Sequence, residues 1–315
     1  MESILEKIII FSRSKVGKLL FNIIENLLCK TLFFNKNNLY NNIINYFQLF
    51  SNGKIFSNFI KKKYLFIDRL NNNNSINSKI VNEININSYS LLGKSNLDII
   101  NEGREFFLNQ DYIYNSHIPL DKNQSRSKVK LEDFYSKEES SYGSFDIKTS
   151  VNCSALLNIS KTFNFKNIAD HYLMSKKSYV YSINTMITKN SKFYDGVTNL
   201  HRDLDSMSSL TFFIYWTETE KDNGATIIYP GSHCFDPDKN FKKYSNKSSN
   251  LKYLSGEIGS IFAVDTWAWH SGNKNIKTNR LVTWVRFTAC PANTYFTDRN
   301  YLFKDELKDF NNRLI

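Results

Sequence analysis

The 315-residue sequence has no hydrophobic run long enough to cross a membrane as a helix. Such a helix needs about 18 or more consecutive apolar residues, and charged or polar residues interrupt every apolar run of this chain sooner. The N-terminus is also untypical of a signal peptide, because Glu2 and Glu6 precede a short apolar run that the polar residues from Ser12 to Lys15 end. We therefore expect no membrane span and a cytoplasmic protein.

Cysteine is scarce and dispersed. The four cysteines, Cys29, Cys153, Cys234 and Cys290, lie far apart, and no two of them form a Cys-x-x-Cys pair. This pattern predicts free thiols in a reducing compartment rather than a disulfide framework. Cys29 falls within an apolar run, so we expect it to be buried. An internal repeat is equally lacking, which argues against a repeat architecture.

Acidic residues are outnumbered by basic ones, with a formal net charge of +11 and a sequence pI near 9.2. A positive balance favours an anionic partner. The lysines are nevertheless scattered through an Asn- and Ile-rich background such as Asn71 to Asn74, and the longest basic run, Lys61 to Lys63, is short. Compositional bias is therefore favoured over a functional role of the charge, which stays open, and we expect no nucleic-acid partner. The positive charge is compatible with a small-molecule substrate, which could be anionic.

The composition predicts a globular protein. Hydrophobic residues make up 41% of the chain and aromatic residues 15%, which is enough to bury a core. The length suits one large catalytic domain with an appended segment, or two domains. We divide the chain into a helical, low-complexity N-terminal region, 1–95, and a domain over 96–315 whose core covers about 147–290.

The N-terminal region predicts helices followed by a linker. Apolar residues recur at helical spacing within 3–50, which favours two or three amphipathic helices that pack on the core. The Asn- and Ser-rich segment 71–90 predicts a loop or linker. A further helix is expected over 95–108, with Asn96 or Asp98 as its N-cap.

A polar, charged stretch over 121–146 predicts a long connection. Long connections near active sites are often lids, so both a lid and a plain surface excursion stay open.

From about residue 147 the pattern changes to short strands separated by turns, after a helix over 166–175. The turn signals include Asp222 to Gly224 and Pro230 to Ser232. The expected strands are Tyr179 to Ile187, Leu210 to Trp216, Ala225 to Tyr229, Gly259 to Val264 and Leu281 to Thr288. Many short strands with tight turns predict a mainly β fold with added helices, a sandwich or barrel such as the jelly roll.

The pattern His201-x-Asp203 with a distant His270 is typical of an iron site with two histidines and one carboxylate. Such a site holds one face of Fe(II) and leaves the other positions open for cosubstrate and oxygen. On a strand, His201 and Asp203 would point to the same side. His270 ends the apolar run that starts at Ile261, so we expect a strand to deliver it. Arg280 follows in the next strand-like segment.

Other residues could replace members of this set. Asp205 has the same strand parity as Asp203 but lies about 13 Å from His201 along an extended strand, so Asp203 is favoured. His233 follows a turn and is expected to cap it or to line the pocket. His171 lies in a helical segment and is expected to be structural, and His117 is either a surface residue or a lid contact.

These stretches resemble the phytanoyl-CoA dioxygenase family of Fe(II)/2-oxoglutarate oxygenases. The resemblance covers about residues 165 to 290. It rests on five motifs, Asn199 to Asp203, Phe212 to Glu218, Asp222 to His233, Gly259 to His270 and Arg280 to Val282. It implies a double-stranded β-helix, a cupin-like jelly roll.

The resemblance also implies a set of ligands. His201, Asp203 and His270 would hold Fe(2+), Arg280 would bind the distal carboxylate of 2-oxoglutarate, and O2 would be the oxidant. A planar guanidinium suits such a carboxylate. Further cosubstrate contacts carried over from the family are Met186, Trp216, Ser271 and Lys148. For Met186, Trp216 and Lys148 the alternative is ordinary barrel packing. Some family members have a serine two residues after the distal histidine, and that position is Gly272 here, with Ser271 beside it.

The implied activity is hydroxylation of an unactivated C–H bond in a small organic molecule, with release of succinate and CO2. Related halogenases lack the carboxylate, so the presence of Asp203 predicts no halogenation. Two other functions remain open, a metal- or ligand-binding jelly roll without turnover and, from charge alone, a nucleic-acid-binding protein.

Overall fold

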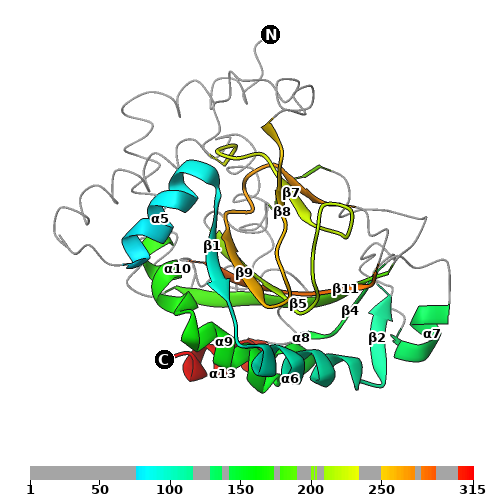
Figure 1. The fold of residues 1–315 in the computed structure, drawn as a ribbon. Helices are drawn as coiled ribbons and strands as arrows, with labels where there is room; N and C mark the ends of the chain where they lie inside the picture. The colour runs from blue at the N-terminus through cyan, green and yellow to red at the C-terminus, as the bar shows by residue number, and fades with distance from the viewer. Residues whose placement is uncertain are drawn as a thin grey trace, which may run out of the picture.

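The computed structural model describes residues 76–115, 128–136, 142–173, 178–189, 200–201, 203, 209–233, 250–273, 278–288 and 304–315. Two antiparallel sheets form its centre (Figure 1). The larger has the strand order β1-β9-β6-β11-β5-β4-β2-β3, and the smaller has the order β10-β7-β8.

The strands have the following bounds. The large sheet contains β1 (Tyr89–Lys94), β2 (Tyr112–Asn115), β3 (Lys128–Lys130), β4 (Tyr142–Ser144), β5 (Tyr179–Thr188), β6 (Ser209–Tyr215), β9 (Ser260–Val264) and β11 (Arg280–Thr288). The small sheet contains β7 (Thr226–Ile228), β8 (Lys252–Leu254) and β10 (His270–Gly272).

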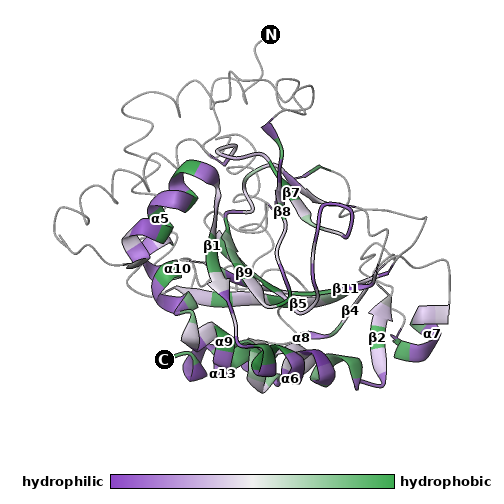
Figure 2. Cartoon of the chain, viewed as in Figure 1, coloured by the Kyte–Doolittle hydropathy of each residue, from purple (hydrophilic) through white to green (hydrophobic). Residues whose placement is uncertain are grey.

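Helices cover one face of the large sheet, and the small sheet lies over the other (Figure 1). The helices are α5 (Ile76–Asn87), α6 (Leu97–Leu108), α7 (Leu131–Ser136), α8 (Ile147–Val151), α9 (Ser154–Thr162), α10 (Phe165–Leu173) and α13 (Lys304–Arg313). In Figure 2 the helices α5, α6 and α9 carry both hydrophobic and hydrophilic residues, as expected for helices with one side on a core.

Strand β6 shows why both faces of the large sheet are buried. All seven of its residues are buried, and alternate side chains point to opposite faces. Phe212 and Ile214 join the core beneath the helices, and we call this the outer face. Phe213 and Tyr215 join a second core with residues of the small sheet, and we call this the inner face. Because both faces are covered, β6 has no exposed polar side.

Helix α6 packs closely on the outer face. Asn96 caps its first turn by accepting a hydrogen bond from the Asp98 amide at 2.7 Å, which settles the expected choice between the two residues. Gly103 faces Trp216, and a Cβ at this position would overlap the Trp216 ring. A glycine is therefore required where the helix backbone meets that indole.

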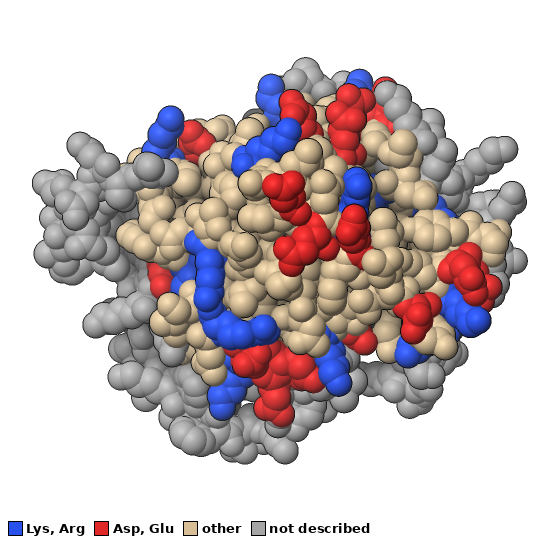
Figure 3. Space-filling model, turned by 60° about the horizontal axis from the view of Figure 1, so that its bottom comes forward, with Lys and Arg blue, Asp and Glu red and all other residues tan. Residues whose placement is uncertain are grey.

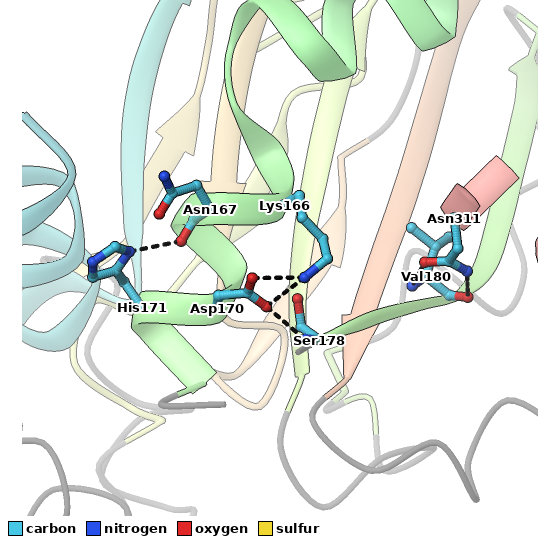
Figure 4. Close-up of polar contacts among 7 residues, drawn as sticks. All are labelled: Lys166, Asn167, Asp170, His171, Ser178, Val180 and Asn311. Atoms are coloured by element: carbon cyan, nitrogen blue, oxygen red, sulfur yellow. Dashed lines mark hydrogen bonds and ion pairs between the residues drawn. The ribbon is translucent and has the colours of Figure 1, made fainter. Parts of the chain in front are cut away.

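Two local hydrogen-bond groups fix the ends of outer-face elements (Figure 4). Asp170 in α10 pairs with Lys166 at 2.6 Å and accepts from the Ser178 amide before β5. Asn311 in α13 accepts from the Val180 amide at 2.7 Å and donates to the Val180 carbonyl at 2.9 Å. The Asn311 side chain thus continues the edge of β5 and ties the C-terminal helix to the sheet.

The predicted mainly β fold with added helices is confirmed, and two facing antiparallel sheets are consistent with the jelly roll. The five expected strands correspond to β5, β6, β7, β9 and β11, and the helix over 166–175 to α10. The loop or linker expected over 71–90 is wrong for its described part, since α5 and the start of β1 occupy it. Val81 and Ile84 on α5 are buried, so a hydrophobic face outweighs the asparagines in this segment.

The domain division at 95 stays a prediction, because residues 1–75 with their expected helices and Cys29 lie outside the described part of the chain. Strand β1 nevertheless pairs with β9. The sheet of the predicted 96–315 domain therefore already includes residues 89–94.

The described part of the polar stretch over 121–146 contains regular secondary structure. Of its residues, 128–136 and 142–146 are described and contain β3, α7 and β4. Leu131 and Phe134 are buried, and β4 pairs with β5. These described parts extend the large sheet.

Cys153, which lies before α9, is free, as predicted, and it is also buried. Burial raises the pKa of its thiol to about 11. The other three cysteines lie outside the described ranges.

On the helix-covered side, lysine and arginine are interspersed with aspartate and glutamate (Figure 3). The described residues of this face therefore do not form the basic patch that is typical of a nucleic-acid-binding surface. Among the described helices, none is long and apolar enough to cross a membrane.

Candidate active site

His201, Asp203 and His270 come together, and one potential ligand atom from each lies within 4.8 Å of the others. The Nε2 atom of His201 is 3.7 Å from Oδ1 of Asp203, and Nε2 of His270 is 3.8 Å from Oδ2. His270 and Asp203 are mostly shielded, with exposed side-chain fractions of 8% and 13%, whereas His201 is 36% exposed. The set can hold a metal ion with one side towards solvent.

Backbone hydrogen bonds hold these three residues in place. The amides and carbonyls of His201 and His270 exchange two hydrogen bonds of 2.9 Å, and the Asp203 amide donates to the Thr266 carbonyl at 3.0 Å. His201 and Asp203 therefore both lie alongside the segment from Thr266 to His270. The expectation that His270 ends a strand is wrong, because β9 ends at Val264, a turn follows, and His270 begins β10 of the small sheet.

The surroundings of His270 prepare its Nε2 atom as a ligand. Nδ1 lies 2.9 Å from the Ala268 carbonyl oxygen, and because a carbonyl only accepts, Nδ1 carries the proton. In the neutral ring this leaves the Nε2 lone pair for a metal. Burial lowers the pKa of His270, and the opposing effect of Asp203 is smaller. The imidazole is thus kept neutral.

Asp203 is held as a carboxylate. Burial acts to raise its pKa, but the positive charge of Arg286 lowers it overall. The Nη2 atom of Arg286 lies 2.8 Å from Oδ2 of Asp203. Thr266 adds a side-chain hydrogen bond to the carboxyl group.

Arg280 is a buried guanidinium on the inner face. Its exposed fraction is 3%. Nη2 donates to the Thr226 hydroxyl at 3.3 Å, and the guanidinium lies 5.4 Å from the Tyr215 ring centroid. Burial lowers the pKa of Arg280, while Tyr215 raises it. Within the described ranges Arg280 has no acidic partner, and its Nε has no hydrogen bond. Such a group suits an incoming carboxylate.

The pairing of the small sheet relates Arg280 to the histidines. Thr226, which Arg280 contacts, pairs with Gly272, and Ile228 pairs with His270. Two residues along a strand span roughly 7 Å. Thr226, the residue that Arg280 contacts, is therefore separated from His270 by a distance that a five-carbon dicarboxylate can bridge.

Of the weaker cosubstrate candidates, Met186 lies on the inner face and Trp216 on the outer one. Met186 pairs with Val282, an inner-face residue, and is buried. Trp216 packs against Phe107 of α6 and donates from Nε1 to the Thr283 hydroxyl at 2.7 Å. Trp216 thus corresponds to the packing alternative rather than to a cosubstrate contact.

Lys148 and Ser271 are not directed to the three residues. Lys148 is exposed on α8, a helix of the outer face. Ser271 is buried, but it follows His270 directly in β10, and neighbouring side chains of a strand point to opposite faces. Neither residue supports the contact that the resemblance implied.

The other histidines take the expected structural roles where they are described. Nδ1 of His233 lies 2.7 Å from the Ser88 hydroxyl, which also accepts from the Gly231 amide. His171 hydrogen-bonds the Asn167 carbonyl within α10 (Figure 4). His117 and the rival carboxylate Asp205 fall outside the described residues.

Sequence reasoning missed Arg286 and Tyr215. Arg286 is six positions after Arg280 on β11, so strand periodicity places both on one face. Two arginines on one face of an otherwise apolar strand were the available signal. Tyr215 is adjacent to Trp216, and a one-residue difference in register decides which aromatic side chain reaches Arg280.

The sequence model of the phytanoyl-CoA dioxygenase (PhyH) family matches residues 116–280, more than half of the chain. The chain therefore belongs to this family. The expected class, an oxygenase that depends on Fe(II) and 2-oxoglutarate and uses O2, is confirmed by this membership.

Several solved structures are similar to this chain at low sequence identity. One is EctD from S. alaskensis with 2-oxoglutarate and 5-hydroxyectoine, at 14% identity and a TM-score of 0.49, with 69% of this chain and 78% of that chain covered. The epimerase SnoN from nogalamycin biosynthesis has 12% identity and a TM-score of 0.48, with 67% of this chain and 82% of that chain covered. The carbocyclase SnoK from nogalamycin biosynthesis has 14% sequence identity and a TM-score of 0.47, with 69% of this chain and 84% of that chain covered.

Proposed function

We propose that this oxygenase hydroxylates a C–H bond of a small organic molecule. His201, Asp203 and His270 would hold Fe(II), since two neutral imidazoles and a carboxylate are the ligands of a facial iron site. Three protein ligands leave positions open for cosubstrate and oxygen. When bound, the metal would activate O2, which is the oxidant, and 2-oxoglutarate would supply two electrons as it is oxidised to succinate and CO2.

The buried guanidinium of Arg280 is the observation that carries the proposal. A buried charge is costly unless it is paired, and the described residues offer Arg280 no acidic partner. The distal carboxylate of 2-oxoglutarate would complete this pairing, with Thr226 as a second polar contact. Met186, from β5, would line the same inner face.

Oxygen-transfer chemistry is tested by incubating the iron-loaded protein with 2-oxoglutarate, candidate substrates and ¹⁸O2. We expect succinate formation, and a product that gains one ¹⁸O atom. Chloride should not be incorporated, since Asp203 occupies the position that a halide would need. Succinate formation with a desaturated or rearranged product that lacks ¹⁸O would replace hydroxylation with another oxidation. A filled metal site without succinate would favour the ligand-binding jelly roll.

The substrate is a small molecule, and an anionic one is compatible with the positive charge of the chain. A cytoplasmic location stays a prediction. Fractionation of cells that express a tagged full-length chain tests it.

A further inference from the structure

An ion pair with Arg286 is a close polar contact of Asp203. Nη2 of Arg286 lies 2.8 Å from Oδ2 of Asp203, and the exposed side-chain fractions are 19% and 13%. Charged groups this far from solvent interact more strongly than an exposed pair. The contact is thus able to fix the orientation of the carboxylate.

Arg286 is well placed to act as a rigid support. It lies in β11, which hydrogen-bonds to β5 on one side and β6 on the other. It pairs with Thr211 of β6, whose hydroxyl lies 3.3 Å from that of Thr266. Thr266 contributes a side-chain hydrogen bond to Asp203. Two neighbouring strands and the turn before His270 therefore converge on one carboxyl group.

We propose that Arg286 is a positioning residue that, through its ion pair, holds the carboxylate of Asp203 in the orientation in which it would serve as a metal ligand. This inference rests on the proposed function, because it assigns Asp203 as a ligand. Outer partners of this kind orient a ligating carboxylate, and Arg286 would do so for Asp203. Arg286 also balances the charge of the carboxylate.

Arg286 and Arg280 would then have separate tasks on the same face of the same strand. Arg280 contacts Thr226 and Tyr215, away from Asp203, and would act on the cosubstrate. Arg286 would affect the binding of the metal through Asp203, and this effect would not need the cosubstrate. Removing an outer partner of a metal ligand typically lowers metal affinity by about 10- to 100-fold.

The test is a titration of metal-free, full-length protein with Co(II) in the absence of 2-oxoglutarate, followed by its visible d–d absorption. Arg286→Gln should bind Co(II) about 10- to 100-fold more weakly and show an altered d–d spectrum. Arg286→Lys keeps the charge but not the planar donor, and should recover part of the affinity. Arg280→Gln should match wild type in this assay. Arg104→Gln, on α6, is the surface control.

If the ion pair only competes with the metal for Asp203, Arg286→Gln will bind Co(II) more tightly than wild type, and the proposal is overturned. Equal affinity and an unchanged spectrum for Arg286→Gln would also overturn it. If Arg286→Gln does not fold, judged by circular dichroism, the Arg286→Lys titration decides between the same outcomes.

Failure of the proposed function has a different signature. Wild type would then bind Co(II) independently of His201, which a parallel His201→Ala titration shows. If wild type needs His201 but not Arg286, only the role of Arg286 is lost.

Discussion

At the residue scale, the burial of His270 has a consequence for stability as a function of pH. Burial lowers its pKa below the ordinary value of 6.5, so the unfolded chain takes up this proton before the folded one. Its contribution to the free energy of unfolding of metal-free protein is present above pH 6.5 and is lost as the pH falls. The limiting slope for one proton is about 1.4 kcal/mol per pH unit.

Denaturant unfolding of metal-free wild type and His270→Gln between pH 7.5 and 5 measures this effect. We expect the free energy of unfolding of wild type to fall more steeply below pH 6.5 than that of His270→Gln. Parallel curves would show that the folded imidazole titrates like an exposed one. His171→Gln, which replaces an exposed histidine, is the matched control.

Arg280 predicts opposite effects on stability and on cosubstrate binding. Since its guanidinium is buried without a described acidic partner, Arg280→Met should stabilise the metal-free protein by about 1–4 kcal/mol. The same variant should no longer be saturated by 2-oxoglutarate. Thermal unfolding and calorimetric titration of the metal-loaded protein measure the two effects.

Arg313→Met is the control for Arg280→Met, because Arg313 pairs with Asp309 at 3.0 Å and donates to the Val151 carbonyl. It should not be stabilising and should leave cosubstrate binding unchanged. An Arg280→Met variant that is destabilised, yet binds 2-oxoglutarate like wild type, would assign Arg280 a structural role.

At the element scale, the contact between α6 and β6 depends on Gly103. Alanine normally favours a helix over glycine by about 1 kcal/mol. Here the added Cβ would overlap the fully buried Trp216 ring, and overpacking costs about 1–3 kcal/mol. We expect Gly103→Ala to lower the free energy of unfolding despite its higher helix propensity. Glu105→Ala, on the exposed side of α6, is the control; a stabilised Gly103→Ala would contradict the packing described.

The attachment of α13 to β5 depends on Asn311. Its side chain makes two hydrogen bonds to the Val180 backbone and one to the Leu307 carbonyl. Asn311→Ala leaves these groups without partners, and we expect a loss of about 1–3 kcal/mol. The exposed neighbour Asn312 provides the control, as Asn312→Ala should have little effect in the same urea titration. Equal stability of the two variants would argue against the contact.

The elements that sequence reasoning found and those that it missed differ in their signals. Strands β5, β6 and β11 are long segments rich in β-branched and aromatic residues, and they were predicted almost to their bounds. Strand β10 has only three residues and is defined by its partner β7, so no local signal marks it. Helix α5 was missed because its asparagines suggest a loop, although Val81 and Ile84 provide the buried face.

At the scale of the whole molecule, the site is formed by segments that are distant in sequence. His201 and His270 are joined by a pair of backbone hydrogen bonds, and Arg280 follows on the next strand. Their order in the chain was enough to predict this set. The side of the sheet on which Trp216, Ser271 and Lys148 lie depends on strand register and helix placement. Sequence order alone does not fix these.

The central claim is that His201, Asp203 and His270 hold Fe(II) while Arg280 binds 2-oxoglutarate. The measurement that tests it most directly is an anaerobic titration of the metal-free protein with Fe(II) and 2-oxoglutarate, followed by visible absorption. We expect the charge-transfer band of a chelated Fe(II)–2-oxoglutarate complex in wild type, no band with His201→Ala, and a higher 2-oxoglutarate requirement with Arg280→Ala. Metal binding without a band in wild type would contradict the claim.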